Sequence, residues 1–298
     1  MDAIAGMAVL PNRFLVKLDP TADFFKSYYA HEGVLRFTIK SGHGFKSSGR
    51  IIKDKPDVYC ITKFGADPEF ETETIDNTEN PEWNASRDFL LSDLEQELQI
   101  AVWESDVTLD DLCGYASVLV KNLLAEGGDM TLSVKKKDGT DTGANIVVKG
   151  EHFSFTSDKV SFEASDVSKG GCLGYLTVIV ASAKNLPKSD DMSSSVKVAL
   201  GDYEQSTHSI AAAQTMPGID PCNPYWDKAF EIPLTKERLA EPTLSLTVMD
   251  KSSSVGTVTV DVKKMLSYEG NQIAKEFKVG KGATLRSMVI LRGLAKSN

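Results

Sequence analysis

Cysteine, histidine and long apolar runs are scarce in this chain of 298 residues, and each scarcity excludes a class of protein. The four cysteines stand apart with no CxxC pair, which excludes a zinc ribbon or a disulfide framework and is typical of a reducing compartment. The apolar stretch Ala3–Leu10 is interrupted by Gly6 and lacks a basic flank, so it predicts neither a membrane span nor a secretion signal. Neither HExxH, GxSxG, a phosphate-binding loop nor a dinucleotide fingerprint occurs. We therefore predict that the chain is not an enzyme.

Basic residues are also in deficit. The net charge is −9, the pI is near 5.1 and no long basic run is present, which excludes nucleic acid as a natural partner. The deficit is uneven: residues 1–155 carry 16 Lys and Arg against 26 Asp and Glu, whereas residues 156–298 carry 17 against 16. With 41% hydrophobic and 25% charged residues the composition is that of a globular protein, and the length predicts two domains.

What the chain does contain is an internal repeat. Three segments and one glycine recur in the same order, at offsets of 141, 143, 146 and 142 residues: Gly33–Ile39 as Gly174–Val180, Asn80–Trp83 as Asn223–Trp226, Leu98–Glu104 as Leu244–Asp250, and Gly114 as Gly256. Two copies of one domain, each of about 125 residues, account for all four matches.

Each copy is rich in short strand patterns. In Leu98–Glu104 and in Leu244–Asp250 large apolar residues alternate with smaller or polar ones, the period of a half-buried strand. Helix candidates are short, at Leu119–Ala125 and Val262–Leu266. Many short strands without long helices between them predict an all-β fold of two antiparallel β-sandwiches in tandem.

These motifs resemble the tandem C2 domains of the extended synaptotagmin and tricalbin family. The resemblance rests on the Asn-Pro-x-Trp turn, the acidic loop before the closing glycine, and Ala8–Arg13, which is similar to the end of that family's lipid-binding tube domain. It implies that each of the two antiparallel β-sandwiches is eight-stranded. It also implies an N-terminal segment at 1–32, a first C2 domain at 33–155, a linker at 156–172 and a second C2 domain at 173–298.

The resemblance places a Ca²⁺ site on two loops of the first domain. Glu104, Asp106 and Asp111, with Asp110 as a close substitute, match the third-loop ligand positions, and Asp57 matches a first-loop aspartate. Clustered carboxylates supply the oxygen shell that Ca²⁺ requires. The earlier first-loop aspartate of the family falls near 46–49, where no acid stands, and Asp54 is the candidate to compensate. The alternative is that these acids are only solvated loop charges.

The same loops carry apolar residues. Ile51 and Ile52 lie beside basic neighbours, and Val107 and Leu109 lie between the acids. Apolar residues at loop tips can enter the headgroup region of a bilayer, so we predict membrane contact at these four positions. The alternative is that they cap the core of their own domain.

The second domain lacks most of these acids. Its third loop is Asp250–Gly256 with Lys251 beside the single acid, and its first loop has serines at 193–195 after Asp190 and Asp191. We predict that it binds no Ca²⁺. Its last third holds basic residues that suit anionic lipid or serve only solubility: Lys263, Lys264, Lys275, Lys278, Lys281, Arg286 and Arg292.

Together these features predict a calcium-responsive module that binds anionic phospholipid membranes, with Ca²⁺ as its cofactor. The resemblance implies a parent protein that tethers membranes and transfers lipid, anchored in the endoplasmic reticulum at plasma membrane contacts, with the module on the cytoplasmic face. Protein partners are expected through the second domain. The alternative function is a calcium-independent protein-interaction scaffold.

Overall fold

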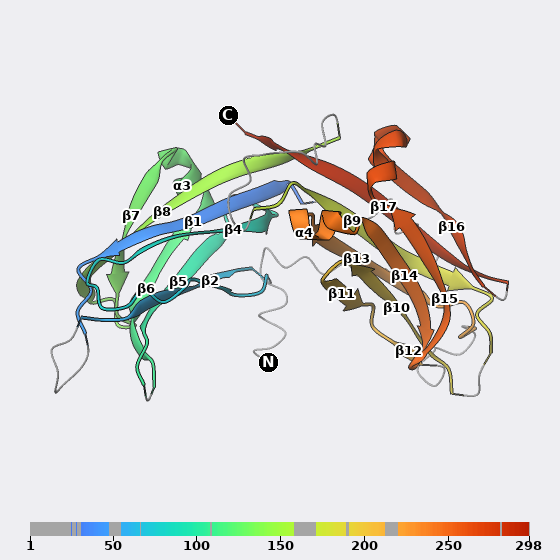
Figure 1. The fold of residues 1–298 in the computed structure, drawn as a ribbon, viewed down its shortest axis with the longest axis horizontal. Coiled ribbons are helices and arrows are strands. Elements are labelled where there is room, and N and C mark those ends of the chain that lie inside the picture. Colours follow the sequence, from blue (N-terminus) through green and yellow to red (C-terminus); the bar gives the residue numbers. More distant parts are fainter. Residues whose placement is uncertain are drawn as a thin grey trace.

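The computed structural model describes residues 25, 28, 31–47, 55–65, 67–107, 109–157, 171–188, 191–211, 220–280 and 282–297. Within them the chain forms two β-sandwiches, as the repeat predicts, which meet at the top of an arch (Figure 1). The first contains β1 (Gly33–His43), β2 (Val58–Phe64), β3 (Phe70–Glu71), β4 (Glu82–Leu91), β5 (Glu97–Glu104), β6 (Asp111–Leu119), α3 (Val120–Glu126), β7 (Asp129–Lys135) and β8 (Asp141–Thr156).

The second sandwich contains β9 (Gly174–Lys184), β10 (Ser193–Leu200), β11 (Tyr203–Ser206), β12 (Ile210–Ala211), β13 (Tyr225–Pro233), α4 (Lys236–Ala240), β14 (Thr243–Asp250), β15 (Ser253–Asp261), η2 (Lys263–Ser267), η3 (Glu269–Asn271), β16 (Gln272–Gly280) and β17 (Ala283–Lys296). The two predicted short helices correspond to α3 and η2. The alternation that predicted strands is confirmed in β5 and β14, where every second residue is buried over most of the strand.

Each sandwich packs two antiparallel layers around its own core. In the first, β4–β1–β8–β7 faces β6–β5–β2–β3, and in the second, β13–β9–β17–β16 faces β11–β10–β14–β15. Buried aromatic rings of Phe37, Phe64 and Phe89 fill the first core, whereas Trp226 and Phe230 lie in the second. The two cores share no member, so each domain buries its own hydrophobic interior.

The sequence repeat extends to the hydrogen bonds. Trp83 Nε1 donates to the carbonyl of Val58 at 3.1 Å, and Trp226 Nε1 donates to the carbonyl of Ser194 at 3.2 Å. The side-chain oxygens of Asn80 and Asn223 accept from the backbone N–H groups of Gly44 and Asn185, respectively. The Asn-Pro-x-Trp turn therefore holds the start of the second strand against the end of the first in both domains.

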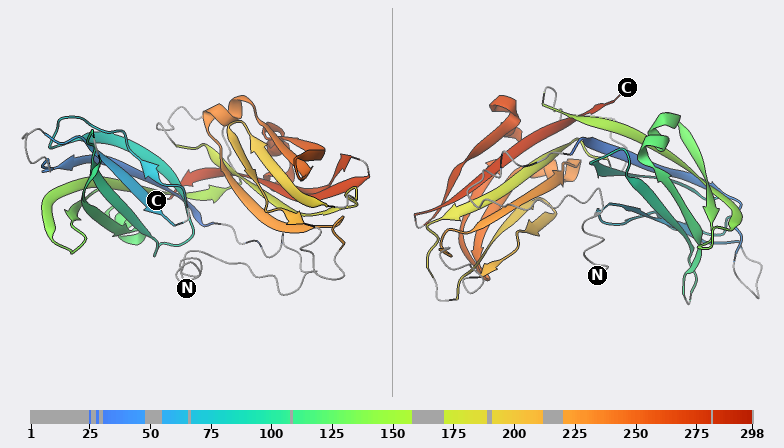
Figure 2. Two further views of the ribbon diagram at one scale, coloured as in Figure 1. Left: turned by 90° about the horizontal axis from the view of Figure 1, so that it is seen from below. Right: turned by 180° about the vertical axis from the view of Figure 1, so that it is seen from behind.

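A strand ladder joins the domains. The end of β17 pairs with the end of β8, from Gly293 opposite Thr156 to Lys296 opposite Phe153, so one sheet continues from the second domain into the first. Figure 2 shows β8 and β17 meeting side by side from two further directions. Of the predicted linker at 156–172, Thr156 ends β8, and residues 158–170 lie outside the described part of the chain.

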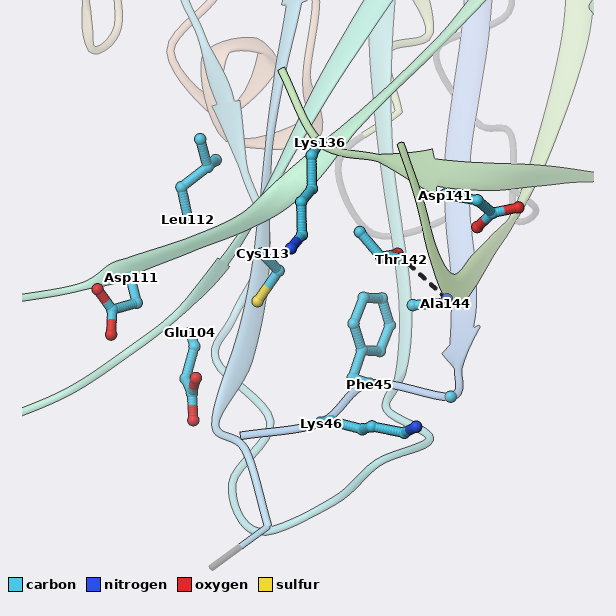
Figure 3. A pocket seen from close by; sticks show the side chains of 11 residues that line it. Phe45, Lys46, Glu104, Asp111, Leu112, Cys113, Lys136, Asp141, Thr142 and Ala144 are labelled. Atoms are coloured by element: carbon cyan, nitrogen blue, oxygen red, sulfur yellow. Dashed lines mark hydrogen bonds between the residues drawn. The ribbon is translucent and has the colours of Figure 1, made fainter. Parts of the chain in front are cut away.

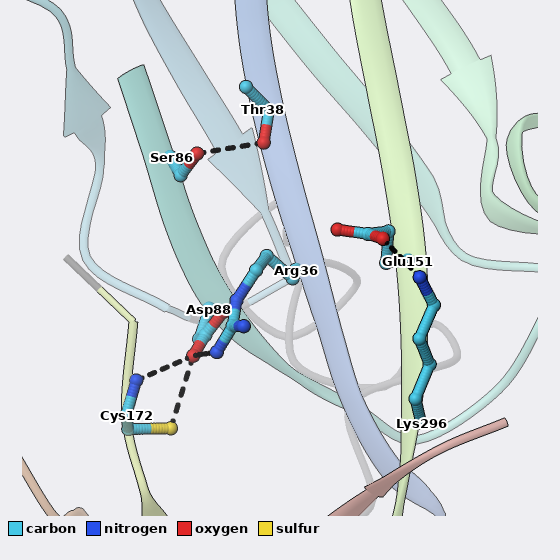
Figure 4. Close-up of polar contacts among 7 residues, drawn as sticks. All are labelled: Arg36, Thr38, Ser86, Asp88, Glu151, Cys172 and Lys296. Atoms are coloured by element: carbon cyan, nitrogen blue, oxygen red, sulfur yellow. Dashed lines mark hydrogen bonds and ion pairs between the residues drawn. The ribbon is translucent and has the colours of Figure 1, made fainter. Parts of the chain in front are cut away.

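A buried ion pair supports the ladder (Figure 4). Arg36 Nε lies 2.8 Å from Asp88 Oδ1, with side chains only 12% and 3% exposed. Asp88 Oδ2 also accepts from the backbone N–H of Cys172 at 2.8 Å and from its Sγ at 3.1 Å. The pKa of the Cys172 thiol is raised, chiefly by burial and then by Asp88. One carboxylate of the first domain therefore anchors the start of the second.

Candidate metal and membrane site

The candidate ligands among the described residues lie where β2 begins, where β5 ends and where β6 begins. Figure 1 shows this end of the first sandwich at the open side of the arch. The strand register explains why. Glu104 is the last residue of β5 and stands opposite Val58 of β2 and Asp111 of β6. Asp57 immediately precedes β2, and Asp106 and Asp110 lie in the connection between β5 and β6.

Asp57 fastens two loops together. Its carbonyl accepts from the N–H of Ser105 at 2.7 Å, and its Oδ1 accepts from the N–H of Asn77 at 2.6 Å. A carboxylate that accepts a backbone N–H stabilises the turn it caps. Asp57 is thus brought to the β5–β6 connection, as the resemblance implies, with one side-chain oxygen already hydrogen-bonded.

Glu104 and Asp111 share a pocket of about 420 Å³ (Figure 3). Glu104 is only 7% exposed, whereas Asp111 is exposed. The Cys113 thiol in the same pocket has its pKa raised to about 12, first by burial and then by the negative charges of Glu104 and Asp111. The two acids therefore create a negative field on one wall of the pocket.

Three pocket residues escape sequence reasoning. Lys46 lies in the β1–β2 connection, Lys136 lies in the β7–β8 connection, Asp141 is the first residue of β8, and all three line the same pocket. Residues 135–137 are exposed at the β7–β8 hairpin, and only the fold brings that hairpin to Glu104 and Asp111. No local sequence signal carries this information, because the pairing of β7 with β8 and of β6 with β7 sets it.

Hydrogen bonds from β2 and from its own loop hold the carboxylate of Asp110 in place. Its Oδ2 accepts from the hydroxyl of Tyr59 at 2.7 Å, and its Oδ1 accepts from the N–H of Asp106 at 3.1 Å. These bonds hold the pKa of Asp110 below its ordinary value, the Tyr59 bond being the larger cause. Burial and the same bond raise the pKa of Tyr59 to about 12. Sequence reasoning missed Tyr59, whose position beside Asp110 depends on β2 pairing with β5.

The apolar loop residues divide into two groups. Val107 and Leu109 are 101% and 81% exposed, so they do not cap the core of their own domain. Ile51, Ile52 and Asp54 lie outside the described residues. At the β5–β6 tip, therefore, two bare hydrophobic side chains stand beside Asp106 and Asp110, an arrangement typical of a surface that enters an interface.

The donor chemistry of the loop end fits a hard cation, since all its candidate ligands are carboxylates. Among the described residues, however, the structure gathers no group of three Asp, Glu, His or Cys close enough to hold a metal ion. Asp57, Asp106 and Asp110 each direct a side-chain oxygen to a hydrogen-bond partner of the protein. The loop end brings the described acids into one region, and their side chains do not converge on one point.

The second domain closes the equivalent end with a tight turn. β14 ends at Asp250 and β15 begins at Ser253, with Lys251 in the left-handed conformation at φ 54°. Asp250 Oδ1 accepts from the N–H of Ser193 at 2.9 Å, and Lys251 Nζ lies 3.6 Å from Asp191. Asp190 lies outside the described residues. The equivalent position therefore holds one backbone-bonded acid and an exposed ion pair.

In the described residues no helix is long and apolar enough to cross a membrane. The short helices lie at the edges of the sandwiches (Figure 1).

The fold defines a class of protein, a pair of antiparallel β-sandwiches fused in tandem. The C2 domain family model matches residues 33–135 and 174–278, and the chain belongs to this family. C2 domains commonly bind phospholipid membranes and are binding modules without catalytic function in the extended synaptotagmins.

The chain is similar to extended synaptotagmins in sequence and in fold. It is 22% identical over 286 residues to extended synaptotagmin-1 of Homo sapiens, a match that covers 90% of this chain and 25% of that protein. A structure of extended synaptotagmin 2 with its SMP domain and two C2 domains superposes with a TM-score of 0.75 at 21% identity, covering 99% of this chain and 64% of that one. The calcium-bound pair of C2 domains from extended synaptotagmin 2 superposes with a TM-score of 0.73 at 21% identity, covering 91% and 100%. The chain spans about a quarter of the length of its extended synaptotagmin-1 relative.

Proposed function

We propose that this tandem C2 module binds anionic phospholipid membranes in response to Ca²⁺, through the loop end of the first domain. One observation supports the proposal: the carboxylates of two loops lie at the same end of the sandwich, beside Val107 and Leu109, which are 101% and 81% exposed. Asp57, Glu104, Asp106 and Asp111 would hold the ion. Asp110 organises the loop through Tyr59.

Charge supplies the switch. Residues 1–155 carry ten more acids than bases, so without metal the first domain is repelled by an anionic leaflet. A bound divalent cation is the largest local charge in such a site and reverses the local field. The metal-loaded loop end then attracts lipid phosphate, and the two apolar side chains enter the headgroup region. The protein groups supply the oxygen ligands and the apolar anchor.

The second domain supports this function without a metal site of its own. Its third loop is a two-residue turn with a lysine, which leaves too few carboxylate oxygens for a Ca²⁺ shell. The resemblance to extended synaptotagmins further suggests a parent protein that tethers membranes and transfers lipid. We place it in the endoplasmic reticulum at plasma membrane contacts, with this module on the cytoplasmic face and protein partners on the second domain.

A second candidate function has its own observation. Asp57 and Asp110 are engaged by hydrogen bonds within the protein, which is also what a metal-free loop scaffold needs. In that case the module is a calcium-independent protein-interaction scaffold whose loop acids serve only to shape the turns.

Two measurements on the full chain separate these functions. Calorimetric titration with Ca²⁺ is expected to give saturable heat, and vesicles of phosphatidylcholine with phosphatidylserine should sediment the protein with Ca²⁺ but not with chelator. Vesicles of phosphatidylcholine alone are the charge control. If the folded protein binds no Ca²⁺ and sediments with neither kind of vesicle, with Ca²⁺ or with chelator, the membrane proposal is wrong. The protein-interaction scaffold is then the remaining candidate function.

A further inference from the structure

Two aromatic residues that precede the first domain in sequence pack against the second domain. The hydroxyl of Tyr28 donates to Glu231 Oε1 on β13, and Thr177 Oγ1 of β9 donates to Glu231 Oε2 at 2.7 Å. The Glu231 carboxylate is thus satisfied from both sides. Without Tyr28 one of its oxygens would lose a partner in a partly buried setting, which is unfavourable for a carboxylate.

Phe25 makes two kinds of contact with the second domain, one with apolar side chains and one with the cationic side chain of Arg286. Phe25 and Tyr28 pack on a small cluster on the outer face of the β13–β9–β17 layer, whose buried members are Ile179 and Met288. The guanidinium of Arg286 lies 4.7 Å from the centre of the Phe25 ring, within the range of a cation–π interaction. This cluster is separate from both domain cores.

The same stretch of chain is fastened to the first domain a few residues later. The backbone N–H of Glu32 donates to the carbonyl of Leu91 at 2.9 Å, and His31 Nδ1 lies 2.7 Å from Ser92 Oγ. Tyr28 and Glu32 are four positions apart in the sequence, which corresponds to a reach of at most about 14 Å for an extended chain. The two anchor points, one on each domain, are therefore within a short span of one another.

We propose that Phe25, Tyr28, His31 and Glu32 form a strap that ties the second domain to the first, and that the outer face of β13–β9–β17 is the docking surface for its aromatic residues. The strap acts alongside the β8–β17 ladder and the Arg36–Asp88–Cys172 contact. It needs no Ca²⁺, because none of its contacts involves a loop acid.

The basic residues of the second domain acquire a specific role in this arrangement. Arg286 stacks on Phe25, and Arg292 lies 5.1 Å from the centre of the Phe155 ring at the junction. Both were candidates for a lipid-binding face on the sequence alone. Each guanidinium lies over an aromatic ring, which belongs to the strap for Arg286 and to the first domain for Arg292, a contact for which Arg is better suited than a simple positive charge.

Oxidation of Met288 tests the strap directly. Met288 is 9% exposed and lies under Phe25 and Tyr28, whereas Met265 is fully buried in the core of the same domain. The full-length chain is treated with dilute peroxide in the presence of chelator, and each methionine is followed by mass spectrometry. We expect the Phe25→Ala, Tyr28→Ala double variant to oxidise Met288 at least tenfold faster than the parent chain, with Met265 unchanged.

Two further variants make the result specific. Tyr28→Phe keeps the ring and removes the hydroxyl, so it should accelerate Met288 oxidation by about fivefold, the factor expected for the net loss of one hydrogen bond. Tyr268→Ala removes an exposed aromatic of the second domain and should change nothing. Equal Met288 rates in the parent and the double variant would overturn the strap. Because chelator is present, that failure is independent of the calcium proposal.

Discussion

The two domains share a framework and differ at their loop ends, position by position. The strand register aligns Asp57, Glu104 and Asp111 of the first domain with Ser193, Asp250 and Ser253 of the second. Two of three acids are serines in the second copy. Its β14–β15 turn also has two residues where the first domain has six between β5 and β6. The same sandwich thus presents an acidic, apolar-tipped loop in one copy and a closed hairpin in the other.

This difference teaches which parts of the fold are free to vary. Cys60 and Val196 donate their N–H groups to the hydroxyls of Thr72 and Thr207, both at 3.0 Å, so the strand beginnings are built identically. The β5–β6 and β14–β15 connections, by contrast, are surface loops, and changing the length of a surface loop costs little free energy. The length and charge of these loops can therefore differ between the two copies without disturbing either core.

The largest expected effect concerns what the domains share. Asp88→Ala leaves Arg36 without its partner in a buried site and removes the acceptor of Cys172. Breaking a buried ion pair costs about 3–5 kcal/mol. Hydrogen exchange followed by mass spectrometry should show lower stability for strands of both domains. An effect confined to β1 and β4 would mean that the domains unfold independently.

The matched control for this junction is an exposed ion pair. Lys184→Ala breaks a contact with Glu276 in which both side chains are about half exposed, 55% and 44%. It is expected to change the free energy of unfolding by about 0–1 kcal/mol.

Removing the loop acids sharpens the contrast between the copies. Asp106→Asn with Asp111→Asn should weaken calcium-dependent binding to phosphatidylserine vesicles by about a hundredfold, because two of the proposed oxygen ligands lose their charge. Asp191→Asn with Asp250→Asn makes the same change in the second domain and should leave sedimentation unaltered. Equal losses in both pairs would contradict the assignment of Ca²⁺ to the first domain.

The apolar tip is expected to matter less than the acids. Val107→Ser with Leu109→Ser should reduce vesicle affinity by about tenfold, since partial burial of two aliphatic side chains contributes about 1–2 kcal/mol. Calcium uptake in solution should be unchanged in calorimetry. Leu266→Ser, an exposed apolar residue of the second domain, provides the control and should retain full affinity. A tip variant with normal vesicle binding would show that the loop does not enter the membrane.

The smallest expected effect concerns the hydrogen bond between Tyr59 and Asp110. Tyr59→Phe removes the main cause of the lowered pKa of Asp110, so that pKa should rise toward its ordinary value of 3.8. A lowered folded-state pKa stabilises the fold above the unfolded value, and this contribution is lost as the pH falls through the folded one. The stability difference between variant and parent should thus be present at neutral pH and disappear in acid. Carboxyl NMR titration measures the pKa of Asp110 in the parent and in the variant, with Tyr115→Phe as control.

The sequence indicates the strands and the repeat because both follow from local patterns. Alternation in Leu98–Glu104 predicts β5, and the paired Asn-Pro-x-Trp turns predict two equivalent corners. Prediction was weaker where a residue's role depends on a distant strand. Asp110 is a candidate ligand in the sequence, but β2 brings Tyr59 to its carboxylate. Lys136 is a hairpin charge in the sequence, and the β6–β7 contact brings it to the acidic pocket.

By itself, then, the sequence determined the two-domain repeat, the sandwich class and the concentration of acids in the first copy, since periodicity and composition are properties of neighbouring residues. Only the tertiary structure decided that the two sandwiches join through β8 and β17, that Asp88 is buried between them, and that Phe25 and Tyr28 reach the second domain. The physical reason is that strand pairing and side-chain burial bring together residues more than fifty positions apart, and no local pattern encodes which of many compatible edges will meet.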